Sequence, residues 1–219
     1  MPPLGRHTNL SFSKAQAIMT TTTGAQMRMH ILGVARPIIL RKGFSGVGLN
    51  EILGAAGIPK GSFYHYFGSK EAFGEALLEV YFEQYAQHLD HTLQHAEGTA
   101  ADRLMRYWRN WLDTQCGDDP QGKCLAVKLG AEVADLSEPM RAVLQRGTQG
   151  IIARVTAGIE AALEDGSLRG IEDPAETARA LYGMWLGATL LDKIHRDGQS
   201  LRIAMRNTRR LLGLAAEPA

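Results

Sequence analysis

The sequence predicts an all-α fold, with a three-helix helix-turn-helix head followed by a larger helical body. Apolar residues recur with a helical period of 3.6 from Met27 onward, and the alternation that marks half-buried strands is almost absent. With 219 residues, 45% of them hydrophobic, the chain can bury a sizeable core. We divide it into a mobile N-terminal arm (1–26), the head (27–72), the helical body (73–214) and a tail (215–219).

The first helix of the head is expected to end at Lys42, because a basic last turn followed by glycine is a common C-terminal signal. Its apolar side comprises Ile31, Leu32, Ala35, Ile38, Ile39 and Leu40. Pro37 removes one backbone hydrogen bond, so this helix either kinks there, which we favour, or begins later. The arm before it is rich in Thr, Ser, Pro and Gly, a poor start for a packed element.

A helix-turn-helix is predicted from residues 49–56 and 60–67, joined by a tight turn. Gly57 tolerates positive φ in that turn, and Ile58 fills the gap between the two helices. Pro59 suits the first helical position, where its missing N–H costs little.

The second of these helices carries the candidate DNA contacts, because the second helix of such a motif enters the major groove. Lys60 and Ser62 can face base edges, and the polar aromatic cluster that follows can donate to phosphates. Phe63 and Phe67, four residues apart, are expected to face the core instead. The proposed DNA-binding residues are Lys60, Gly61, Ser62, Tyr64, His65, Tyr66 and Lys70. The alternative is that the cluster is only the packed corner of a helical bundle.

The run from Lys42 to Phe73 closely resembles the signature of the TetR family of transcriptional repressors in spacing and residue type. This resemblance implies an Ω-shaped homodimer that binds double-stranded operator DNA and releases it on sensing an inducer. It also implies that the head (27–72) is the DNA-binding domain and the body (73–214) the sensor and dimerisation domain. Val47-Gly48 stands where the family usually has a Thr or Ser cap, and Pro59 where Ser is common. Neither departure threatens the fold, but phosphate contacts from those hydroxyls cannot be assumed.

Ser69 is expected to cap a fourth helix from Lys70 to about His95 that links head and body. Further helices are expected at 102–116, 125–133, 139–165, 174–196 and 201–214, each ended by Gly, Pro or an Asp/Gly pair. The last two carry wide apolar stripes, and in the TetR family such helices form the dimer's four-helix bundle.

The charge is unevenly distributed along the chain. Residues 1–70 hold eight Lys or Arg against a single acid, Glu51, whereas the remainder is acidic overall. The basic end is therefore the candidate for a polyanion partner. Neither a membrane span nor a signal peptide is visible, and two cysteines are too few for a disulfide framework or a four-ligand zinc site. We expect a cytoplasmic protein with no membrane partner, no metal and no cofactor.

Cys124 is the most informative residue of the body. It follows a flexible stretch and lies at an expected helix N-terminus, where the helix dipole and Lys123 would both stabilise a thiolate. A small buried apolar residue is the commoner role of a free cysteine. Residues 122–141 and 181–194 resemble the body of TetR-family repressors that sense reactive electrophiles or oxidants, and more distantly that of an acrylate-responsive one.

This second resemblance implies that Cys124 is the sensing cysteine, Lys193 its partner and Cys116 a further cysteine. A thiolate adds to an unsaturated carbonyl or quinone, or is oxidised to a sulfenic acid that an amine can trap. Without the resemblance, Lys193 is equally a cation at a helix C-terminus, and Cys116 more often a bystander.

Four aromatic residues at helical spacing are candidates for a ligand pocket that admits a small apolar electrophile: Tyr107, Trp111, Tyr182 and Trp185. Such stripes are more often core or dimer seam. Two other functions stay open: a repressor with a reversible ligand such as acrylate, a drug or a lipid, and an enzyme using Cys124 with one of seven histidines. No motif supports the enzyme.

Overall fold

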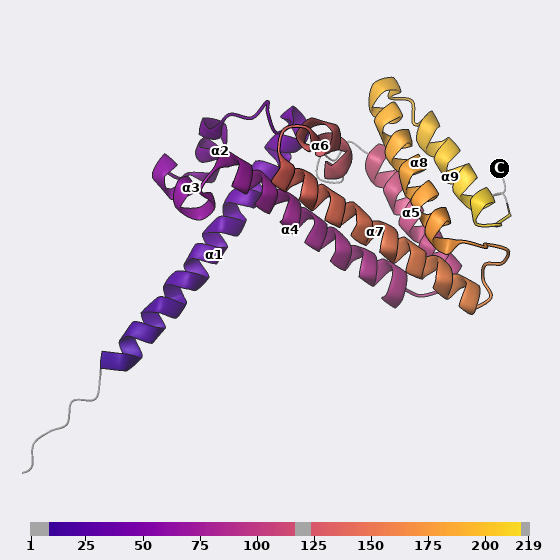
Figure 1. The fold of residues 1–219 in the computed structure, drawn as a ribbon, viewed down its shortest axis with the longest axis horizontal. Coiled ribbons are helices and arrows are strands. Elements are labelled where there is room, and N and C mark those ends of the chain that lie inside the picture. The colour runs from indigo at the N-terminus through magenta and orange to yellow at the C-terminus, as the bar shows by residue number, and fades with distance from the viewer. Residues whose placement is uncertain (1–8, 117–123, 216–219) are drawn as a thin grey trace, which may run out of the picture.

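The computed structural model describes residues 9–116 and 124–215, with side chains for 24–115 and 124–215. Across these ranges the chain is helical and forms no strand, which confirms the all-α prediction (Figure 1). In chain order the helices are α1 (Asn9–Lys42), α2 (Leu49–Ala56), α3 (Lys60–Phe67), α4 (Lys70–Asp90), the π-helical turn η1 (His91–His95), α5 (Ala100–Cys116), α6 (Leu125–Ala134), α7 (Glu138–Glu164), α8 (Pro174–His195) and α9 (Gln199–Leu211).

The head consists of the last turns of α1 together with α2, α3 and the start of α4. Its core is built on aromatic contacts: the rings of Phe63, Phe67 and Phe73 lie 5.1 to 5.3 Å apart between centroids. Phe63 and Phe67 are buried, as their spacing predicted. Ile39 and Ile52 complete this core from α1 and α2.

Local signals place α2, α3 and the start of α4 as predicted. Gly57 ends α2 in the left-handed conformation with φ of 65°, and the Ser69 hydroxyl accepts a hydrogen bond from the amide of Ala72 at 2.9 Å. Gly48 precedes α2 without a side-chain cap. Pro59 occupies the position before the first helical residue, one earlier than expected, because its backbone is extended (φ −71°, ψ 155°).

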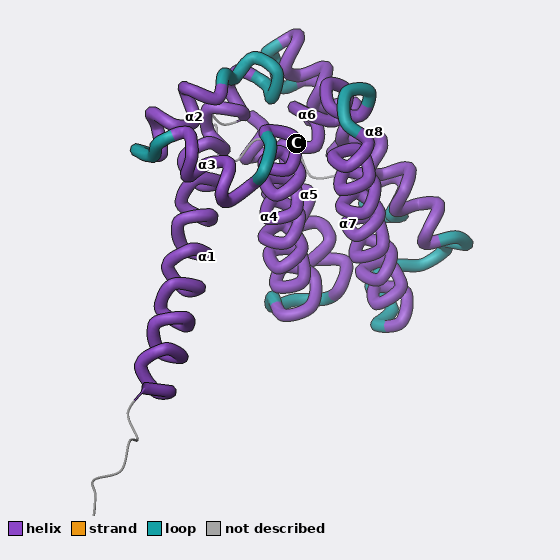
Figure 2. The backbone as a smooth tube through the Cα atoms, turned by 60° about the vertical axis from the view of Figure 1, so that its left-hand side comes forward, coloured by secondary structure: helices purple, strands orange, loops and turns teal. Residues whose placement is uncertain are grey.

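Helix α1 is longer than the sequence suggested. It begins at Asn9, inside the segment expected to be an arm, and it continues without interruption through Pro37, so it does not begin after that proline. Threonine is only a few tenths of a kcal/mol less favourable in a helix than most residues, and a formed helix propagates through such residues more easily than it nucleates. Figure 2 shows this first part of α1 projecting away from the body.

The predicted fourth helix changes geometry near its end. It is α-helical to Asp90 and then forms the π-helical turn η1 over His91–His95. The hydroxyl of Thr92 donates to the carbonyl of His88 at 2.9 Å, where it competes with the backbone bond that an α-helix would make. The π-helical turn widens the helix at this point.

The body is built around α4 and α7, which lie side by side and run in the same direction from the head (Figures 1 and 2). Helix α5 returns against α7 and η1, and α8 packs between α7 and α9. At the end remote from the head, α8 and α9 form a pair (Figure 1). The short α6 lies between head and body.

Three tryptophans fix α5 against α8 and α9. The Trp108 and Trp185 rings stack with centroids 5.2 Å apart, and both are fully buried. The indole N–H of Trp111 donates to Thr189 at 3.0 Å, and that of Trp185 donates to Thr208 at 2.8 Å. These buried hydrogen bonds fix the register of three helices, because an unpaired indole N–H would cost about 1–3 kcal/mol.

The close approach of α4 and α7 gives a first prediction. A Cβ added at Gly147 would lie 2.3 Å from the ring of Phe82, which is buried. We expect Gly147→Ala to lower the free energy of unfolding by about 1–3 kcal/mol, although alanine favours the helix. Urea unfolding at fixed protein concentration measures the change.

Gly150→Ala is the matched control on the same helix. An added Cβ there meets only the end of the Arg154 side chain, at 3.5 Å, so we expect this variant to gain up to about 1 kcal/mol from helix propensity. Equal effects of the two substitutions would show that the helix crossing does not depend on the missing side chain.

Candidate DNA-binding head and sensor cavity

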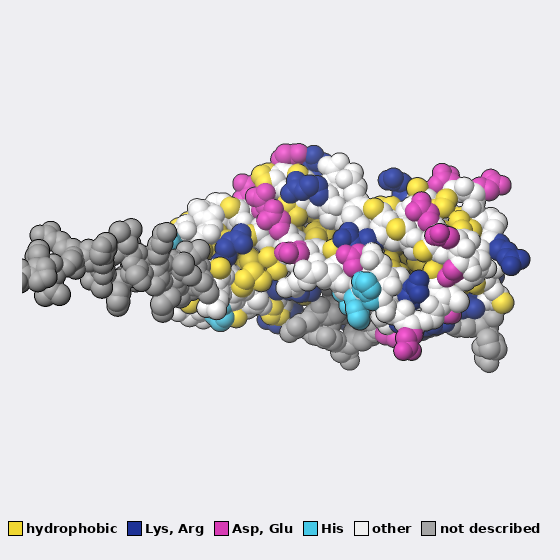
Figure 3. Space-filling model, turned by 90° about the horizontal axis from the view of Figure 1, so that it is seen from below, with side chains coloured by type: hydrophobic (Ala, Val, Ile, Leu, Met, Phe, Trp, Pro, Cys, Tyr) yellow, Lys and Arg dark blue, Asp and Glu magenta, His cyan; other side chains and the backbone are white. Residues whose placement is uncertain are grey.

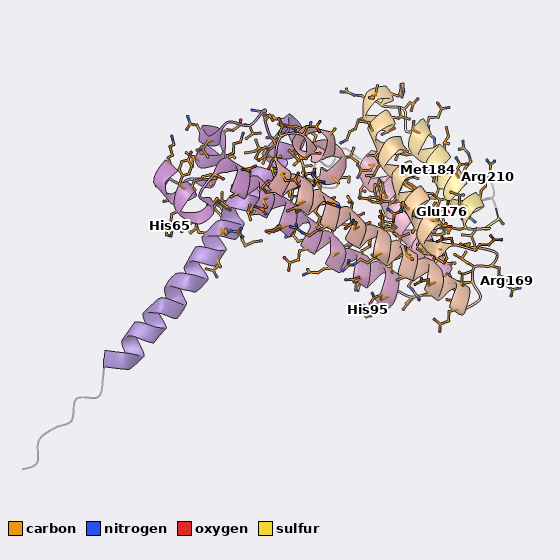
Figure 4. The ribbon with its side chains drawn as sticks, in the orientation of Figure 1. His65, His95, Arg169, Glu176, Met184 and Arg210 are labelled. Carbon is orange, nitrogen blue, oxygen red and sulfur yellow. The ribbon has the colours of Figure 1, made fainter. Side chains whose placement is uncertain are left out.

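The outer side of α3 presents the side chains expected to meet DNA. Lys60, Tyr64 and His65 are exposed, and the Lys60 ammonium lies 6.0 Å from the centroid of the Tyr64 ring. Figure 4 shows His65 at the end of the molecule remote from α8 and α9. This surface therefore combines a cation with hydroxyl and imidazole groups on one short helix.

The other predicted DNA contacts are less open. Ser62 and Tyr66 are half-buried, whereas Gly61 is exposed with open space where a Cβ would lie. The Lys70 ammonium donates to the carbonyl of Phe44 at 3.0 Å and lies 4.8 Å from that ring's centroid. Lys70 thus ties the start of α4 to the α1–α2 loop.

A cavity of about 290 Å³ lies between α1, α4, α5 and the start of α6. It is bounded by residues from segments far apart in the sequence. Its lining comprises Arg36, Tyr81, Gln84, Tyr85, His88, Tyr107, Asn110, Trp111, Thr114, Gln115 and Cys124. A space of this size admits a small molecule.

Cys124 stands in the wall of this cavity as the N-cap residue of α6, which confirms its expected place at a helix N-terminus. Only 8% of the residue is exposed. The Tyr81 hydroxyl donates to its sulfur at 3.7 Å, and its backbone amide donates to the Gln115 side chain at 3.4 Å. The thiol is therefore held between α4 and α5 and faces the cavity.

Three tyrosines surround the thiol as neutral hydroxyl groups. Burial, and then the neighbouring Cys124, raise the pKa of Tyr81 well above its ordinary value, and burial likewise raises the pKa of Tyr85 and of Tyr107. The hydroxyls of Tyr85 and Tyr107 share a hydrogen bond of 3.1 Å. All three can act as hydrogen-bond donors near neutral pH.

The four aromatic pocket candidates fall into two groups. Tyr107 and Trp111 line the cavity, whereas Tyr182 and Trp185 are not in its lining. Tyr182 packs edge-on against Trp111 with centroids 5.9 Å apart, and Trp185 stacks on Trp108. The α8 aromatics therefore support the cavity wall from behind.

Lys193 is half-buried on α8, one turn beyond Thr189. Because Trp108 stacks on Trp185 and Trp111 bonds to Thr189, α5 and α8 run in parallel here. In this register Gln115 of α5 and Lys193 of α8, each four residues beyond the Trp111–Thr189 pair, lie at the same height along the two helices. Cys116 ends α5, but its side chain lies outside the described residues.

Helix α6 also reaches the head. The carboxylate of Glu132 accepts hydrogen bonds from the backbone amides of Phe44, at 3.1 Å, and Ser45, at 2.6 Å. Burial opposes its charge, but these hydrogen bonds outweigh burial and hold the pKa of Glu132 below its ordinary value. The contact requires glycine at position 43, where φ is +82° and a Cβ would lie 2.8 Å from the carboxylate.

Two further contacts join the same region to the head. The Lys128 ammonium donates to the carbonyl of Arg41 at 3.3 Å, and the Ser137 hydroxyl donates to Glu71 at 2.6 Å. Helix α6 and the turn after it therefore contact α1, the α1–α2 loop and α4.

Sequence reasoning did not single out Arg36, Tyr81, Tyr85 or Glu132. The four-residue spacing of Tyr81 and Tyr85 could have marked one face of α4, as the spacing of the α5 aromatics did. No comparable sequence pattern marks Arg36 or Glu132, because each contacts a segment that is remote from it in the sequence.

An apolar stripe on α8 and α9 stays exposed. Gly183, Gly187, Leu190 and Ile194 share one side of α8, and Leu190 and Ile194 are 52% and 64% exposed. Ile203 and Leu211 of α9 are also exposed. This end of the body is where Figure 4 labels Met184 and Arg210. Exposed apolar side chains grouped in this way mark an interaction surface.

The surface seen in Figure 3 differs from that stripe. Basic and acidic side chains are interspersed there over the body, with no extended patch of one sign on that face.

Within the described ranges, none of the helices has the length and apolarity needed to cross a membrane. Nor do the described His, Cys, Asp and Glu residues form a group of three that could hold a metal ion.

Two family models match the chain: bacterial regulatory proteins of the tetR family over residues 31–77, and the tetracyclin repressor-like C-terminal domain over residues 100–208. The transcriptional repressor NemR of Escherichia coli K12 is 40% identical over 198 residues, covering 90% of this chain and all of NemR. The repressor DhaR of Mycobacterium sp. strain GP1 is 33% identical over 80% of this chain and 86% of its own.

The regulator AcuR of Cereibacter sphaeroides is 35% identical over 71% of each chain. Among solved structures, the reduced form of E. coli NemR matches with a TM-score of 0.80 at 41% identity, over 89% of this chain and 99% of that one. These matches cover both the head and the body, and they confirm the resemblances found in the sequence. The chain belongs to the TetR family of DNA-binding transcriptional repressors.

Proposed function

We propose that this protein binds its operator as a homodimer and releases it when a reactive electrophile or an oxidant modifies Cys124. The observation that carries the proposal is the position of the thiol. It lines a cavity at the N-cap of α6, and the same helix holds the head through Glu132. The solved E. coli NemR is a reduced form, which supports redox chemistry as one input.

The chemistry needs only the thiol and the incoming reagent. When the thiol adds to an unsaturated carbonyl compound, the sulfur bonds to the β-carbon and the thiol proton passes to the α-carbon. With hypochlorite as oxidant, the thiol becomes a sulfenic acid and chloride is released. The Lys193 amine then displaces water to form an S–N bond, or Cys116 displaces water to form a disulfide.

Modification in this position disturbs α6 directly. The thiol is buried and in contact with Tyr81, and its own amide is bonded to Gln115. An adduct on the sulfur breaks its contact with Tyr81 and adds volume beside the first turn of α6, which shifts the N-terminus of this helix. The other end of α6 binds the loop that positions α2, and movement there disturbs the head.

On the DNA side we assign the exposed surface of α3 to operator recognition. Lys60 and Ser62, with Gly61 allowing close approach, face base edges in the major groove. Tyr64, His65 and Tyr66 donate to phosphates, and Lys70 adds positive charge at the start of α4. The α8–α9 stripe joins two copies, so two heads reach successive half-sites.

A reversible ligand is the second candidate, and the cavity itself favours it. A space of about 290 Å³ lined by Tyr107, Trp111 and polar side chains can hold a small molecule without covalent chemistry. The two candidate functions differ in their need for Cys124, because only covalent modification requires its sulfur.

Operator release with N-ethylmaleimide tests the first candidate. We expect the unmodified protein to bind its own promoter DNA and to lose at least about tenfold in affinity after alkylation, whereas Cys124→Ser stays bound. Cys116→Ser is the control and should respond like the unmodified protein. Release of Cys124→Ser to the same extent would instead support the reversible ligand.

The role of Glu132 is tested by comparing the operator affinity of the protein before and after alkylation of Cys124. Glutamine keeps one acceptor oxygen but loses the charge and the second amide hydrogen bond, so we expect Glu132→Gln to shrink the ratio of operator affinities before and after alkylation by up to about tenfold. The alkylation rate of Cys124, followed by intact mass, should not change.

Glu160→Gln supplies the matched control, because Glu160 is exposed on α7. Its affinity ratio should equal that of the unmodified protein. If Glu132→Gln keeps the full ratio, the signal reaches the head by another route.

The dimer surface is tested with Leu190→Lys. When two copies associate, a lysine in the middle of the stripe would have to be buried as a charge in the interface. We therefore expect the mass measured by sedimentation to fall toward that of one chain, and operator affinity to fall with it. Leu136→Lys is the control, because Leu136 is 67% exposed beyond α6 and away from the stripe. Dimers of unchanged stability in Leu190→Lys would place the interface elsewhere.

A further inference from the structure

Two phenol hydroxyls meet in the wall of the sensor cavity. Tyr85 of α4 and Tyr107 of α5 both line it, and their hydroxyl oxygens lie 3.1 Å apart. Either hydroxyl can donate to the other, because a hydroxyl hydrogen rotates about its C–O bond. The rings themselves are held by packing: that of Tyr107 lies 4.5 Å from the Trp108 ring, and that of Tyr85 lies 5.8 Å from the Tyr81 ring, between centroids. The pair is therefore a positioned group of hydrogen-bond donors.

Both hydroxyls keep their hydrogens near neutral pH. Burial is the largest cause that raises the pKa of Tyr85 and of Tyr107, and the nearby Cys124 raises both values further. The effect of Cys124 on each phenol also indicates that both hydroxyls lie within electrostatic reach of its sulfur. A neutral phenol donates a hydrogen bond without giving up its proton. The pair therefore suits an uncharged oxygen that gains negative charge during a reaction.

Tyr81 relates the hydroxyl pair to the thiol. Its hydroxyl donates to the sulfur of Cys124 at 3.7 Å, and its ring is inclined by only 30° to the ring of Tyr85. Tyr81 and Tyr85 are four residues apart on α4, which is about 6 Å along the helix axis. The sulfur and the hydroxyl pair are therefore neighbours along one wall of the cavity, about one helical turn apart. A small molecule can contact both at once.

We propose that the hydroxyls of Tyr85 and Tyr107 bind the carbonyl oxygen of an unsaturated electrophile while its β-carbon bonds to the Cys124 sulfur. A conjugated carbonyl compound has its oxygen and its β-carbon at the two ends of one rigid unit. In the addition a carbon–sulfur bond forms and the electrons of the carbon–carbon double bond shift toward the carbonyl oxygen. The thiol proton ends on the α-carbon, and no group leaves. This inference rests on the proposed function and specifies the class of its inducer.

The hydroxyl pair favours one kind of thiol reagent over others. Donors aimed at the atom where negative charge develops lower the barrier of a reaction, and their effect is largest in a site that excludes water. Tyr107 is only 3% exposed, which meets that condition. An enone, a quinone or an imide develops charge on its carbonyl oxygen, whereas an alkyl halide has no such oxygen. The cavity therefore accelerates addition to a conjugated carbonyl compound and leaves simple alkylation unaided.

The rates of Cys124 alkylation by two small neutral reagents test the inference. N-ethylmaleimide adds through a double bond conjugated to carbonyl groups, whereas allyl bromide alkylates sulfur with loss of bromide and contains no oxygen. All proteins carry Cys116→Ser, so that a single thiol reacts, and intact mass gives the second-order rate constants. We expect the ratio of the N-ethylmaleimide rate to the allyl bromide rate to fall at least about tenfold when Tyr85→Phe and Tyr107→Phe are combined. Each single variant keeps one donor and should lose less.

Tyr182→Phe is the matched control. Tyr182 is buried, and burial and then Cys124 raise its pKa as well, but it is not in the cavity lining. Within the described residues its hydroxyl has no hydrogen-bond partner, so its removal breaks no such bond. The rate ratio of this variant should equal that of the parent. The allyl bromide rate should be similar in all variants, which shows that the cavity still admits a small reagent.

The outcomes separate this inference from the proposed function. An unchanged ratio in the combined Tyr85 and Tyr107 variant, or an equal fall in Tyr182→Phe, overturns the role of the hydroxyl pair while leaving Cys124 as the sensor. If N-ethylmaleimide does not alkylate Cys124 in the parent protein, both the role of the pair and the proposed function are overturned.

Discussion

The carboxylate of Glu132 accepts hydrogen bonds from two backbone amides of the α1–α2 loop, and this contact ties the helix that begins at the sensor cavity to the head. It depends on a negative charge on α6, on free amides in the loop, and on a glycine at position 43 that leaves room for the carboxylate. Phe44 is half-buried and Ser45 is exposed, and the two hydrogen bonds to Glu132 hold this loop against α6.

Helix α6 suits this role because it is short. Its ten residues are too few to form a stable helix alone, so its position is set by its packing against α7 and by the groups that hold its two ends. One end is held at Cys124 by Tyr81 and Gln115, and the other by the contacts of Glu132 with the head. In the proposed function, a change at one end is passed to the other as movement of the whole helix.

The head could be predicted almost residue by residue, whereas the cavity could not. The positive φ of Gly57, the cap at Ser69 and the burial of Phe63 are local properties, determined within one or two turns. The cavity is formed where α1, α4, α5 and α6 meet, and helical periodicity shows which residue is buried but not which buried faces surround an open volume. Arg36 was therefore read only as a charge.

The two sides of the cavity differ in how easily they can move. On the α5 side, the indoles of Trp111 and Trp185 bond to Thr189 and Thr208, which locks α5, α8 and α9 together. The opposite side is formed by α1 and α6, and besides their buried apolar side chains these helices are joined to neighbouring segments by hydrogen bonds at the surface and at the α1–α2 loop. In the proposed function, added volume at the thiol displaces the side formed by α1 and α6, while the α8–α9 surface that we propose as the dimer interface keeps its geometry.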